Sequence, residues 1–320
     1  MLSVALLSTF SLVAAASPAS AAKDFKNRPK ALLMVQPMID HPVHRLMQAG
    51  FLIRCKQLGY ECKVIGNASA TVFDEAATLP LVEAELAARK YGGLLIYQVS
   101  PPLFKITTDL SKKGYPIVGW HAMPKKGSVV GLLASAAQNI AAAGTGPADE
   151  ICRIAKNVGT VAITQGSLND EENLKAASFR TQLALKCPAM KMTETGIEGF
   201  DSAKAIAIAS GMLSVNPDIV AAYSTTGNGA QTWSLGAAQA SRKITIIGMD
   251  YIRQNLDLIR DGKVYGVVGQ PLFEQSIVAV NILDGILKGK KYVYENIVPA
   301  KLVTKKNVKE YYAILKKAGQ

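Results

Sequence analysis

The sequence predicts an α/β protein made of two similar doubly wound parallel-sheet lobes joined by a hinge. Short, almost continuously apolar runs alternate with longer segments of helical periodicity along most of the chain, a pattern typical of parallel strands covered by helices on both faces. About ten strands are expected, which is many for one doubly wound sheet, so two sheets of five or six strands fit better. No low-complexity or linker-like stretch divides the halves, which favours lobes joined by several chain crossings.

The first half of the chain contains repeated strand and helix units. An apolar strand at 30–36 is followed by a loop with proline and by a helix whose apolar side chains recur at helical spacing from Val43 to Leu58. Gly59 ends this helix. Further strands are expected at 60–66, 93–97 and 115–120, and further helices at 73–91 and 103–113.

The second half continues the alternation after a long helical stretch. This stretch is expected from about 127 to 156, broken by a turn at 144–147. Strands follow near 158–164, 189–195, 218–224, 244–248 and 264–269, with helices near 170–186, 201–214, 229–240, 251–261 and 272–288. A polar linker with an extended piece at 289–303 and a closing helix at 305–319 complete the chain. We expect one lobe to comprise 23–134 and 271–299, and the other 135–270 and 300–320.

The composition is that of a packed globular protein. Hydrophobic residues make up 49% and charged residues 19% of the 320 residues, which excludes a disordered, collagen-like or coiled-coil chain. The net charge is +12, but the lysines occur in short pairs such as Lys305-Lys306 and not in one block. This pattern favours a solvated basic surface over a binding site for nucleic acid or another anion.

The first 22 residues resemble a signal peptide. An apolar run from Leu2 to Ala16 precedes small residues and an Ala-x-Ala cleavage site at Ala19–Ala21, although no Lys or Arg precedes the run. The run is shorter than the roughly 20 residues of a permanent membrane span. We therefore expect cleavage and a soluble mature protein in the periplasm.

The cysteine count also fits an exported protein. Four cysteines, an even number, are present at positions 55, 62, 152 and 187, and exported cysteines can pair as disulfides. Cys55 lies near a helix end and Cys62 early in the next strand, so these two can bridge the intervening turn, leaving Cys152 to pair with Cys187. Four buried free thiols are the alternative. The spacings match no zinc pattern, and no metal is expected.

Polar and aromatic residues follow the expected strands. Ligands of open α/β sheets bind beyond the carboxyl ends of the strands, so these positions are the candidates for a binding site. Hydrogen-bonding groups, a few charges and several flat rings suit a polyhydroxylated ligand. The set comprises Asp40, His41, His44, Tyr97, Gln98, Trp120, His121, residues 166–175, Phe200, Asp201, Thr225, Thr226, Asn228, Asp250 and Gln270.

Six segments give the chain a family resemblance. They are the loop and helix at 40–51, the strand start Gly114–Val118, Phe200-Asp201, Ile246–Asp250, Val267–Pro271 and Pro299–Lys305. In this order and spacing the chain resembles the periplasmic type I sugar-binding proteins of the ribose-binding cluster, which serve ABC importers. The resemblance implies that a sugar is bound between the two lobes and that no cofactor is involved.

The resemblance also assigns pocket positions in this sequence. Asp250 and Gln270 match the family pattern directly, and Phe200 matches a stacking Phe. His41, Val43 and His44 stand where a typical member has Asn and two stacking Phe, and Tyr97 stands at a hydroxyl-binding Asn. His121 replaces an Asp that is usually followed by Arg, Lys175 stands at a second Arg, and Thr226, with Asn228 close by, replaces an Asn. The missing Asp-Arg pair and the missing Phe rings argue against simple ribose recognition.

Several of these residues have alternative structural roles. Asp250 can instead cap the helix expected to begin at Tyr251, and Asp201 is better explained as a helix cap than as a ligand contact. Neighbours on a strand point to opposite faces, so at most one of Trp120 and His121 is expected to line the cleft squarely. Lys175, at a helix start, can face solvent instead.

The function classes can be separated on the same evidence. No nucleophile elbow, phosphate loop or metal-spaced cluster of His and carboxylates suggests an enzyme. A signal peptide stands where sugar-sensing repressors carry a DNA-binding headpiece, so no nucleic-acid partner is expected. We expect a monomeric receptor that binds a monosaccharide, sugar alcohol or amino sugar and delivers it to an inner-membrane ABC permease. A receptor for an autoinducer, nucleoside or amino acid, or a ligand-presenting sensor subunit, is the alternative.

Overall fold

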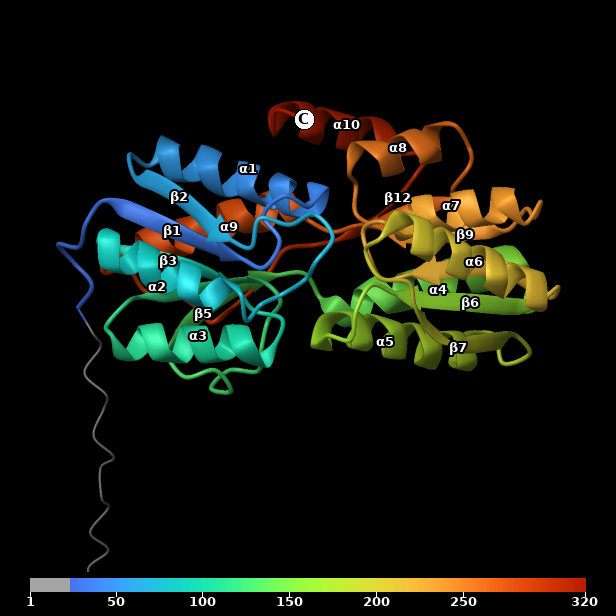
Figure 1. Ribbon diagram of the computed structural model, residues 1–320, viewed down its shortest axis with the longest axis horizontal. Coiled ribbons are helices and arrows are strands. Elements are labelled where there is room, and N and C mark those ends of the chain that lie inside the picture. The colour runs from blue at the N-terminus through green and yellow to red at the C-terminus, as the bar shows by residue number, and fades with distance from the viewer. Residues whose placement is uncertain (1–23) are drawn as a thin grey trace, which may run out of the picture.

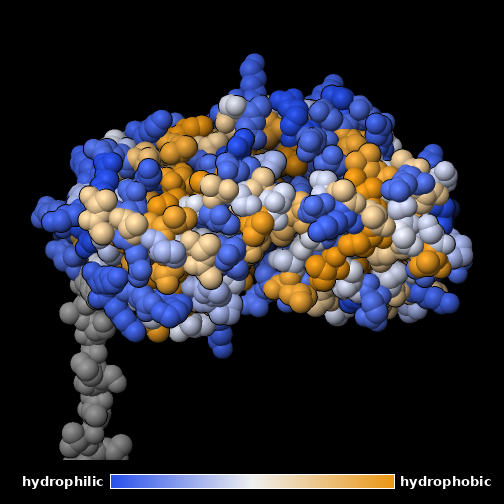
Figure 2. All heavy atoms as spheres, viewed as in Figure 1, coloured by the Kyte–Doolittle hydropathy of each residue, from blue (hydrophilic) through white to orange (hydrophobic). Residues whose placement is uncertain are grey.

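The computed structural model describes residues 24–320, which form two α/β lobes side by side (Figure 1). Each lobe contains a six-stranded sheet, and the expected fold class is confirmed. The expected signal peptide at 1–22 lies outside the described residues. Within the described part of the chain, no helix has the length and apolar character needed to cross a membrane. On the face shown in Figure 2, hydrophobic residues lie in separate patches among hydrophilic ones on both lobes.

The first lobe is built on a parallel sheet with the strand order β11-β5-β4-β3-β1-β2. Its strands are β1 (Ala31–Gln36), β2 (Glu61–Gly66), β3 (Gly93–Tyr97), β4 (Ile117–His121), β5 (Leu132–Ala137) and β11 (Glu295–Ile297). Its helices are α1 (Pro42–Gln57), α2 (Thr78–Ala88), α3 (Pro101–Lys112) and α9 (Leu272–Leu287). All residues of β1, β3 and β4 are buried, as expected for strands covered on both faces.

The second lobe repeats this plan with the strand order β12-β10-β9-β8-β6-β7. Only the pairing of β10 with β12 is antiparallel among the described strands of this sheet. Its strands are β6 (Thr160–Gln165), β7 (Lys191–Ile197), β8 (Ile219–Ser224), β9 (Thr245–Met249), β10 (Gly266–Gly269) and β12 (Lys301–Thr304). Its helices are α4 (Ile140–Ala155), α5 (Asp170–Lys186), α6 (Ser202–Val215), α7 (Gly229–Gln239), α8 (Arg253–Arg260) and α10 (Val308–Lys317).

The chain passes between the sheets after β5, after β10 and after β11. Gln138 follows β5 and Gln270 follows β10, and the amide of Gln138 donates a hydrogen bond to the side-chain oxygen of Gln270. The first two crossings are therefore joined directly. The lobe boundary expected between residues 134 and 135 falls inside β5, so the first crossing comes after Ala137 and later than expected.

The region around α4 corrects two expectations. Residues 132–137, expected to be helical, form β5, because they pair with β4 on one side and with β11 on the other and are mostly buried. The turn expected at 144–147 lies inside α4. Pro147 has no N–H for the carbonyl of Ala143, four residues earlier, but the Tyr223 hydroxyl donates to that carbonyl at 2.8 Å. Helix α4 continues because this acceptor is satisfied by another strand.

Both expected disulfides are present. Cys55 at the end of α1 is bonded to Cys62 on β2, with the Cα atoms 6.1 Å apart. Cys152 on α4 is bonded to Cys187 at the end of α5, with the Cα atoms 5.8 Å apart. The alternative of four free thiols is therefore wrong. The second bridge fixes α4 to α5, the helix whose first turns face the other lobe (Figure 1).

Candidate ligand-binding site

A cavity lies between the two lobes at the carboxyl ends of both sheets. It encloses about 50 Å³, less than the range of about 300–1,000 Å³ typical of small-molecule sites. The lining comes from strand ends and helix starts of both lobes: Met38, His41, Val43, His44, Phe73, Tyr97, Val99, His121, Asn169, Glu171, Glu172, Lys175, Phe200, Thr225, Thr226, Gly227, Asp250 and Gln270.

Flat rings form one wall of the cavity. The His121 ring stacks on Tyr97, with centroids 4.7 Å apart and an interplanar angle of 16°, and His44 packs against the same tyrosine at 5.4 Å. Phe200 from the second lobe makes an edge contact with His41 at 6.1 Å. Rings from both lobes therefore surround the cavity and offer apolar faces to a ligand.

Two of these histidines are neutral at pH 7. Burial lowers the pKa of His41 to about 4, although a hydrogen bond with the side chain of Asn228 raises it. Burial, together with the charges of His41 and His121, holds the pKa of His44 well below its usual value. A neutral imidazole can donate at one ring nitrogen and accept at the other. His41 and His44 can thus serve a ligand with both kinds of group.

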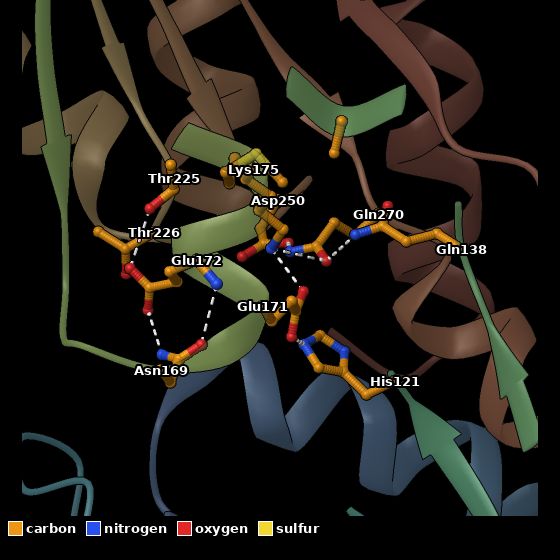
Figure 3. A network of polar contacts seen from close by, with 12 residues as sticks. His121, Gln138, Asn169, Glu171, Glu172, Lys175, Thr225, Thr226, Asp250 and Gln270 are labelled. Carbon is orange, nitrogen blue, oxygen red and sulfur yellow. Dashed lines mark hydrogen bonds and ion pairs between the residues drawn. The ribbon is translucent and has the colours of Figure 1, made fainter. Parts of the chain in front are cut away.

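A buried ion pair crosses the cavity between the lobes (Figure 3). Nε2 of His121, at the end of β4, lies 2.6 Å from a carboxylate oxygen of Glu171, in the first turn of α5. The other oxygen of Glu171 lies 2.5 Å from Nζ of Lys175, one turn along the same helix. Burial raises the pKa of Glu171, but His121 and Lys175 outweigh it and bring the pKa to about 2. Glu171 is therefore ionised.

The start of α5 is held by its own capping residues. The side-chain oxygen of Asn169 accepts from the backbone N–H of Glu172 at 2.9 Å, which is an N-cap contact. Glu172 in turn accepts from the backbone N–H of Gly166 at 2.5 Å and from the Thr225 hydroxyl at 2.9 Å. Burial raises the pKa of Glu172. These bonds fix the helix turn that carries Glu171 and Lys175.

Asp250 and Gln270 form a second polar group beside Lys175 (Figure 3). The amide of Gln270 donates to Oδ1 of Asp250 at 2.7 Å, and Nζ of Lys175 donates to the amide oxygen of Gln270 at 3.4 Å. Burial raises the pKa of Asp250 to about 6, against the opposing charges of Lys175 and His121. Asp250 is thus a buried carboxylate with acceptor capacity left for a ligand.

His121 and Asp250 also share an unusual backbone conformation. Their φ angles are 75° and 70°, in the left-handed region, and they stand at the ends of β4 and β9, the fourth strands of their lobes. Asp and His enter this region more readily than most residues. Backbone strain of this kind costs on the order of 1–3 kcal/mol and gathers at functional sites. The two lobes thus present equivalent strained residues to one cavity.

The chain matches a family model described as a periplasmic binding protein domain over residues 32–291. The chain belongs to the periplasmic binding protein family. The expected resemblance is thereby confirmed. A search of curated proteins finds no match.

Solved structures of this family share the fold. The glucose-galactose binding protein GanP from Geobacillus stearothermophilus aligns with a TM-score of 0.79 at 21% identity, over 87% of this chain and 98% of that chain. An ABC transporter solute binding protein from Agrobacterium vitis, bound with α-D-tagatopyranose, gives 0.80 at 16% identity, over 89% and 98%. One from Bacillus halodurans with bound myo-inositol gives 0.76 at 18% identity, over 90% and 99%.

Most of the residues expected at this family's pocket line the cavity. These are His41, His44, Tyr97, His121, Lys175, Phe200, Thr226, Asp250 and Gln270. Trp120 does not line it: the ring is fully buried and packs edge-on behind Tyr97 at 4.9 Å. Asn228 also lies outside the lining and hydrogen-bonds His41. Contact of any of them with a ligand stays a prediction.

The helix-cap alternatives are also resolved. Asp201 caps α6, because its carboxylate accepts from the backbone N–H of Lys204 at 3.0 Å. Asp250 caps no helix: α8 begins at Arg253, with Ile252 at its N-cap. Lys175 faces the cavity and is 2% exposed, so the alternative of a solvent-facing lysine is wrong.

The family resemblance seen in the sequence did not assign some of the residues that line the cavity. Glu171 and Glu172 lie in the segment 166–175 that was singled out as following a strand, but acidic residues in a first helix turn also stabilise the helix dipole and gave no sign of facing inward. Phe73 was expected to begin the helix at 73–91, but α2 begins at Thr78, so Phe73 lies in the loop before it and packs against Tyr97 and Phe200. No periodic pattern marks a loop residue of this kind.

Proposed function

We propose that this chain is the solute-binding receptor of an ABC importer and binds a monosaccharide, sugar alcohol or amino sugar in the cavity between its lobes. The observation that carries the proposal is the mixed lining of that cavity. Rings from both lobes stand beside buried hydrogen-bonding groups at the carboxyl ends of both sheets. Sugars present apolar C–H faces and many hydroxyls, and this lining offers partners for both.

Each part of the lining has a role in this proposal. The rings of Tyr97 and Phe200 pack on the C–H faces of the ligand. The carboxylates of Glu171 and Asp250 accept from hydroxyls, and hydrogen bonds to charged groups are the stronger ones. Lys175 and Gln270 donate to ring or hydroxyl oxygens. The ligand thus joins groups of both lobes.

The charges of the cavity narrow the ligand class further. The lining contains three acidic side chains, Glu171, Glu172 and Asp250, and two basic ones, Lys175 and His121. Both basic side chains contact Glu171, so neither offers a free positive charge to a ligand. This balance favours neutral or amino sugars over sugar acids. The sugars and the polyol named for the solved structures belong to the same chemical class. The sequence identity of those proteins to this chain is low, so the likeness supports the fold and not the ligand.

Binding is proposed to proceed by hinge closure. A ligand that contacts both lobes has a higher affinity for the closed form, and this difference shifts the equilibrium between open and closed forms. The three chain crossings beside Gln138 and Gln270 are the positions at which the backbone turns. The closed form would then be recognised by the permease in the inner membrane. We infer no enzymatic step, no cofactor, a monomer, and the periplasm as the site of action.

A thermal-shift screen of residues 23–320 tests the proposal. The panel comprises pentoses, hexoses, polyols, amino sugars and aldonic acids, with amino acids and nucleosides as the contrasting set. A ligand at 100 times its dissociation constant stabilises by about 2.7 kcal/mol, enough to raise the melting temperature by several degrees. We expect a selective rise with one sugar, polyol or amino sugar. A rise with an amino acid or nucleoside alone would replace the sugar class with that alternative.

A further inference from the structure

The second lobe carries another cavity, at the end of its sheet opposite to the candidate site. It encloses about 630 Å³. Its walls are the last turns of α7, the turn that leads into β9, the loop between α8 and β10, and the residues that follow β12. The strands β9 and β10 begin here and end at Asp250 and Gln270 in the interlobe site, so the whole length of the sheet separates the two cavities.

The lining of this cavity is basic and contains no acidic residue. It comprises Ser234, Leu235, Ala237, Ala238, Arg242, Lys243, Ile244, Thr245, Ile246, Gly262, Lys263, Val264, Tyr265, Thr304, Lys305 and Lys306. Five of these are Lys or Arg, and none is Asp or Glu. The four lysines come from three separate segments of the chain and converge on one hollow. A concave surface of one charge concentrates the field and attracts counter-ions.

The positive charges of this cavity are not neutralised by ion pairs. Arg242 donates to the backbone carbonyls of Leu213, Pro217 and Ile219 at 3.1, 2.7 and 2.8 Å, which holds the guanidinium in place without a carboxylate. Within residues 24–320, no salt bridge involves Lys243, Lys263, Lys305 or Lys306.

The carboxylates whose charges act on these lysines are engaged elsewhere. Asp261 interacts electrostatically with Lys263 and Lys305, but its ion pair is with Arg260, at 2.8 Å. Glu150 interacts electrostatically with Lys306, but its ion pair is with Arg153, at 2.8 Å. The positive charge of the cavity is therefore available to an external anion.

Between the basic groups the surface is apolar. Ile246 and Val264 are buried beneath the cavity, and Leu235 stands at its edge with 42% of its surface exposed. Ala238 is exposed on α7 and leaves room above them. An inorganic ion would contact only the lysines and would leave this apolar surface exposed to water. A molecule with an apolar body and an anionic head would use both.

We propose that this cavity binds a small organic anion with an apolar body, such as an aliphatic carboxylate. The apolar body lies against Ile246, Val264 and Leu235, and the carboxylate is held by Lys263 and Lys305. The volume of about 630 Å³ is that of a small-molecule site. This site is independent of the sugar proposal, since it shares no residue with the interlobe cavity.

Calorimetric titration of residues 23–320 at low ionic strength, with sodium octanoate as the probe, tests the proposal. We expect one octanoate site whose affinity exceeds that for 1-octanol by about tenfold or more, and no binding of octyltrimethylammonium. Salt should weaken octanoate binding, because exposed charges are screened. Equal affinity for octanoate and octanol would overturn the anionic part of the proposal.

Variants locate the site. The double change Lys263→Glu with Lys305→Glu should reduce octanoate affinity about tenfold or more, whereas Lys90→Glu with Lys191→Glu, at exposed positions outside the cavity, should leave it unchanged. Ala238→Trp should fill the cavity and abolish binding. Melting temperature and circular dichroism report whether each variant folds, and the lysine variants still test the site if Ala238→Trp does not.

Three further results would contradict the proposal. Loss of octanoate binding in Asp250→Ala, with the lysine variants binding normally, would move octanoate to the interlobe cavity. An oligonucleotide that binds as tightly as octanoate and displaces it would make this surface a general polyanion site. Full octanoate binding in the Lys263→Glu, Lys305→Glu protein would equally refute it.

Discussion

Asp250 combines three properties that are unfavourable for stability: burial, a carboxylate and a left-handed backbone. The φ angle of 70° and a pKa raised by burial to about 6 both belong to this one residue. It makes no helix cap that would compensate for them. Residues whose burial or backbone conformation is unfavourable, with no compensating structural contact, are expected at functional sites. This reasoning gives Asp250 the first place among the candidate ligand contacts.

Replacing Asp250 with Ala should reduce the affinity for the ligand found in the screen by at least about tenfold, or about 1.4 kcal/mol. The reason is the loss of a buried charged acceptor for ligand hydroxyls. Asp201→Ala is the matched control, because Asp201 caps α6 outside the cavity. The control should lose about 1 kcal/mol of stability and keep its affinity. Calorimetric titration measures both variants, and an Asp250→Ala protein that binds normally would remove Asp250 from the site.

Glu198 provides a test of pH dependence away from the cavity. It is 2% exposed, and one oxygen accepts from the Ser224 hydroxyl at 3.1 Å. Burial raises the pKa of this carboxyl to about 7. The unfolded chain therefore loses this proton at lower pH than the folded protein. The stability due to the protonated form is complete below about pH 4.5 and is lost as the pH rises through about 7.

Glu198→Gln should remove this pH dependence. At pH 8 the variant should be more stable than the parent protein by up to about 3.5 kcal/mol, from ~1.4 kcal/mol for each of the roughly 2.5 pH units between the two pKa values. At pH 4.5 the difference should be much smaller, because the parent carboxyl is then mostly protonated. Urea denaturation at several pH values measures the effect. The same difference in stability at all pH values would exclude titration of Glu198 as its cause.

At the scale of elements, α5 depends on how closely α4 approaches it. Gly144 on α4 has no side chain, and a Cβ there would lie 2.3 Å from the carbonyl oxygen of Lys175 and 2.7 Å from the backbone N of Phe179. Both of these atoms belong to the backbone, so they cannot move away by a side-chain rotation. The glycine thus sets the position of the helix that carries Glu171 and Lys175 into the site.

Gly144→Ala should destabilise the protein by about 1–3 kcal/mol, because it overpacks this helix contact, and it should weaken ligand binding by displacing α5. Gly211→Ala in α6 is the matched control, since no atom beyond its chain neighbours and its own helix backbone lies within 4 Å of its Cβ position. The control should gain about 0.5–1 kcal/mol, because Ala favours a helix more than Gly does. Thermal and urea denaturation measure both. Opposite signs are required, and a destabilised Gly211→Ala protein would undermine the argument from packing.

The elements also indicate what the sequence alone can establish. The strands at 93–97 and 219–224 and the two disulfides were predictable, because apolar runs, helix ends and cysteine spacing are local signals. The strand β5 was not, because Leu132–Ala137 is rich in Ala and forms a strand only through pairing with β4 and β11. Pro147 stays helical only because Tyr223 comes from a distant strand. The inward position of Glu171 depends in the same way on His121 in the other lobe.

At the scale of the whole molecule, the two lobes place equivalent residues at equivalent strand ends. His121 and Asp250 stand at the ends of the fourth strands, and Gln138 and Gln270 follow the fifth. The two glutamines meet at the crossings and bond to each other. The two strained residues instead face the cavity on either side of Lys175 and Glu171 (Figure 3). The repeated plan therefore yields one hinge and one site, and the contacts across the cavity govern how the lobes sit together.

The His121 to Glu171 ion pair is the polar contact most able to hold the lobes together in this way. Both side chains are at least nine-tenths buried, and removing one charge of a buried pair leaves its partner uncompensated, which is strongly unfavourable. Opening the lobes returns that partner to water. Glu171→Gln should therefore shift the protein without ligand towards the open form.

Small-angle X-ray scattering without ligand measures this shift as a larger radius of gyration for Glu171→Gln than for the parent protein. Asp109→Asn is the matched control, because it breaks an ion pair with Lys105 that lies within α3 and is exposed to solvent. The control should leave the radius unchanged, since an exposed pair within one helix contributes little to stability and does not join the lobes. Saturating ligand should return both variants to the radius of the ligand-bound parent. Equal radii for Glu171→Gln and the parent without ligand would mean that this ion pair does not set the opening of the lobes.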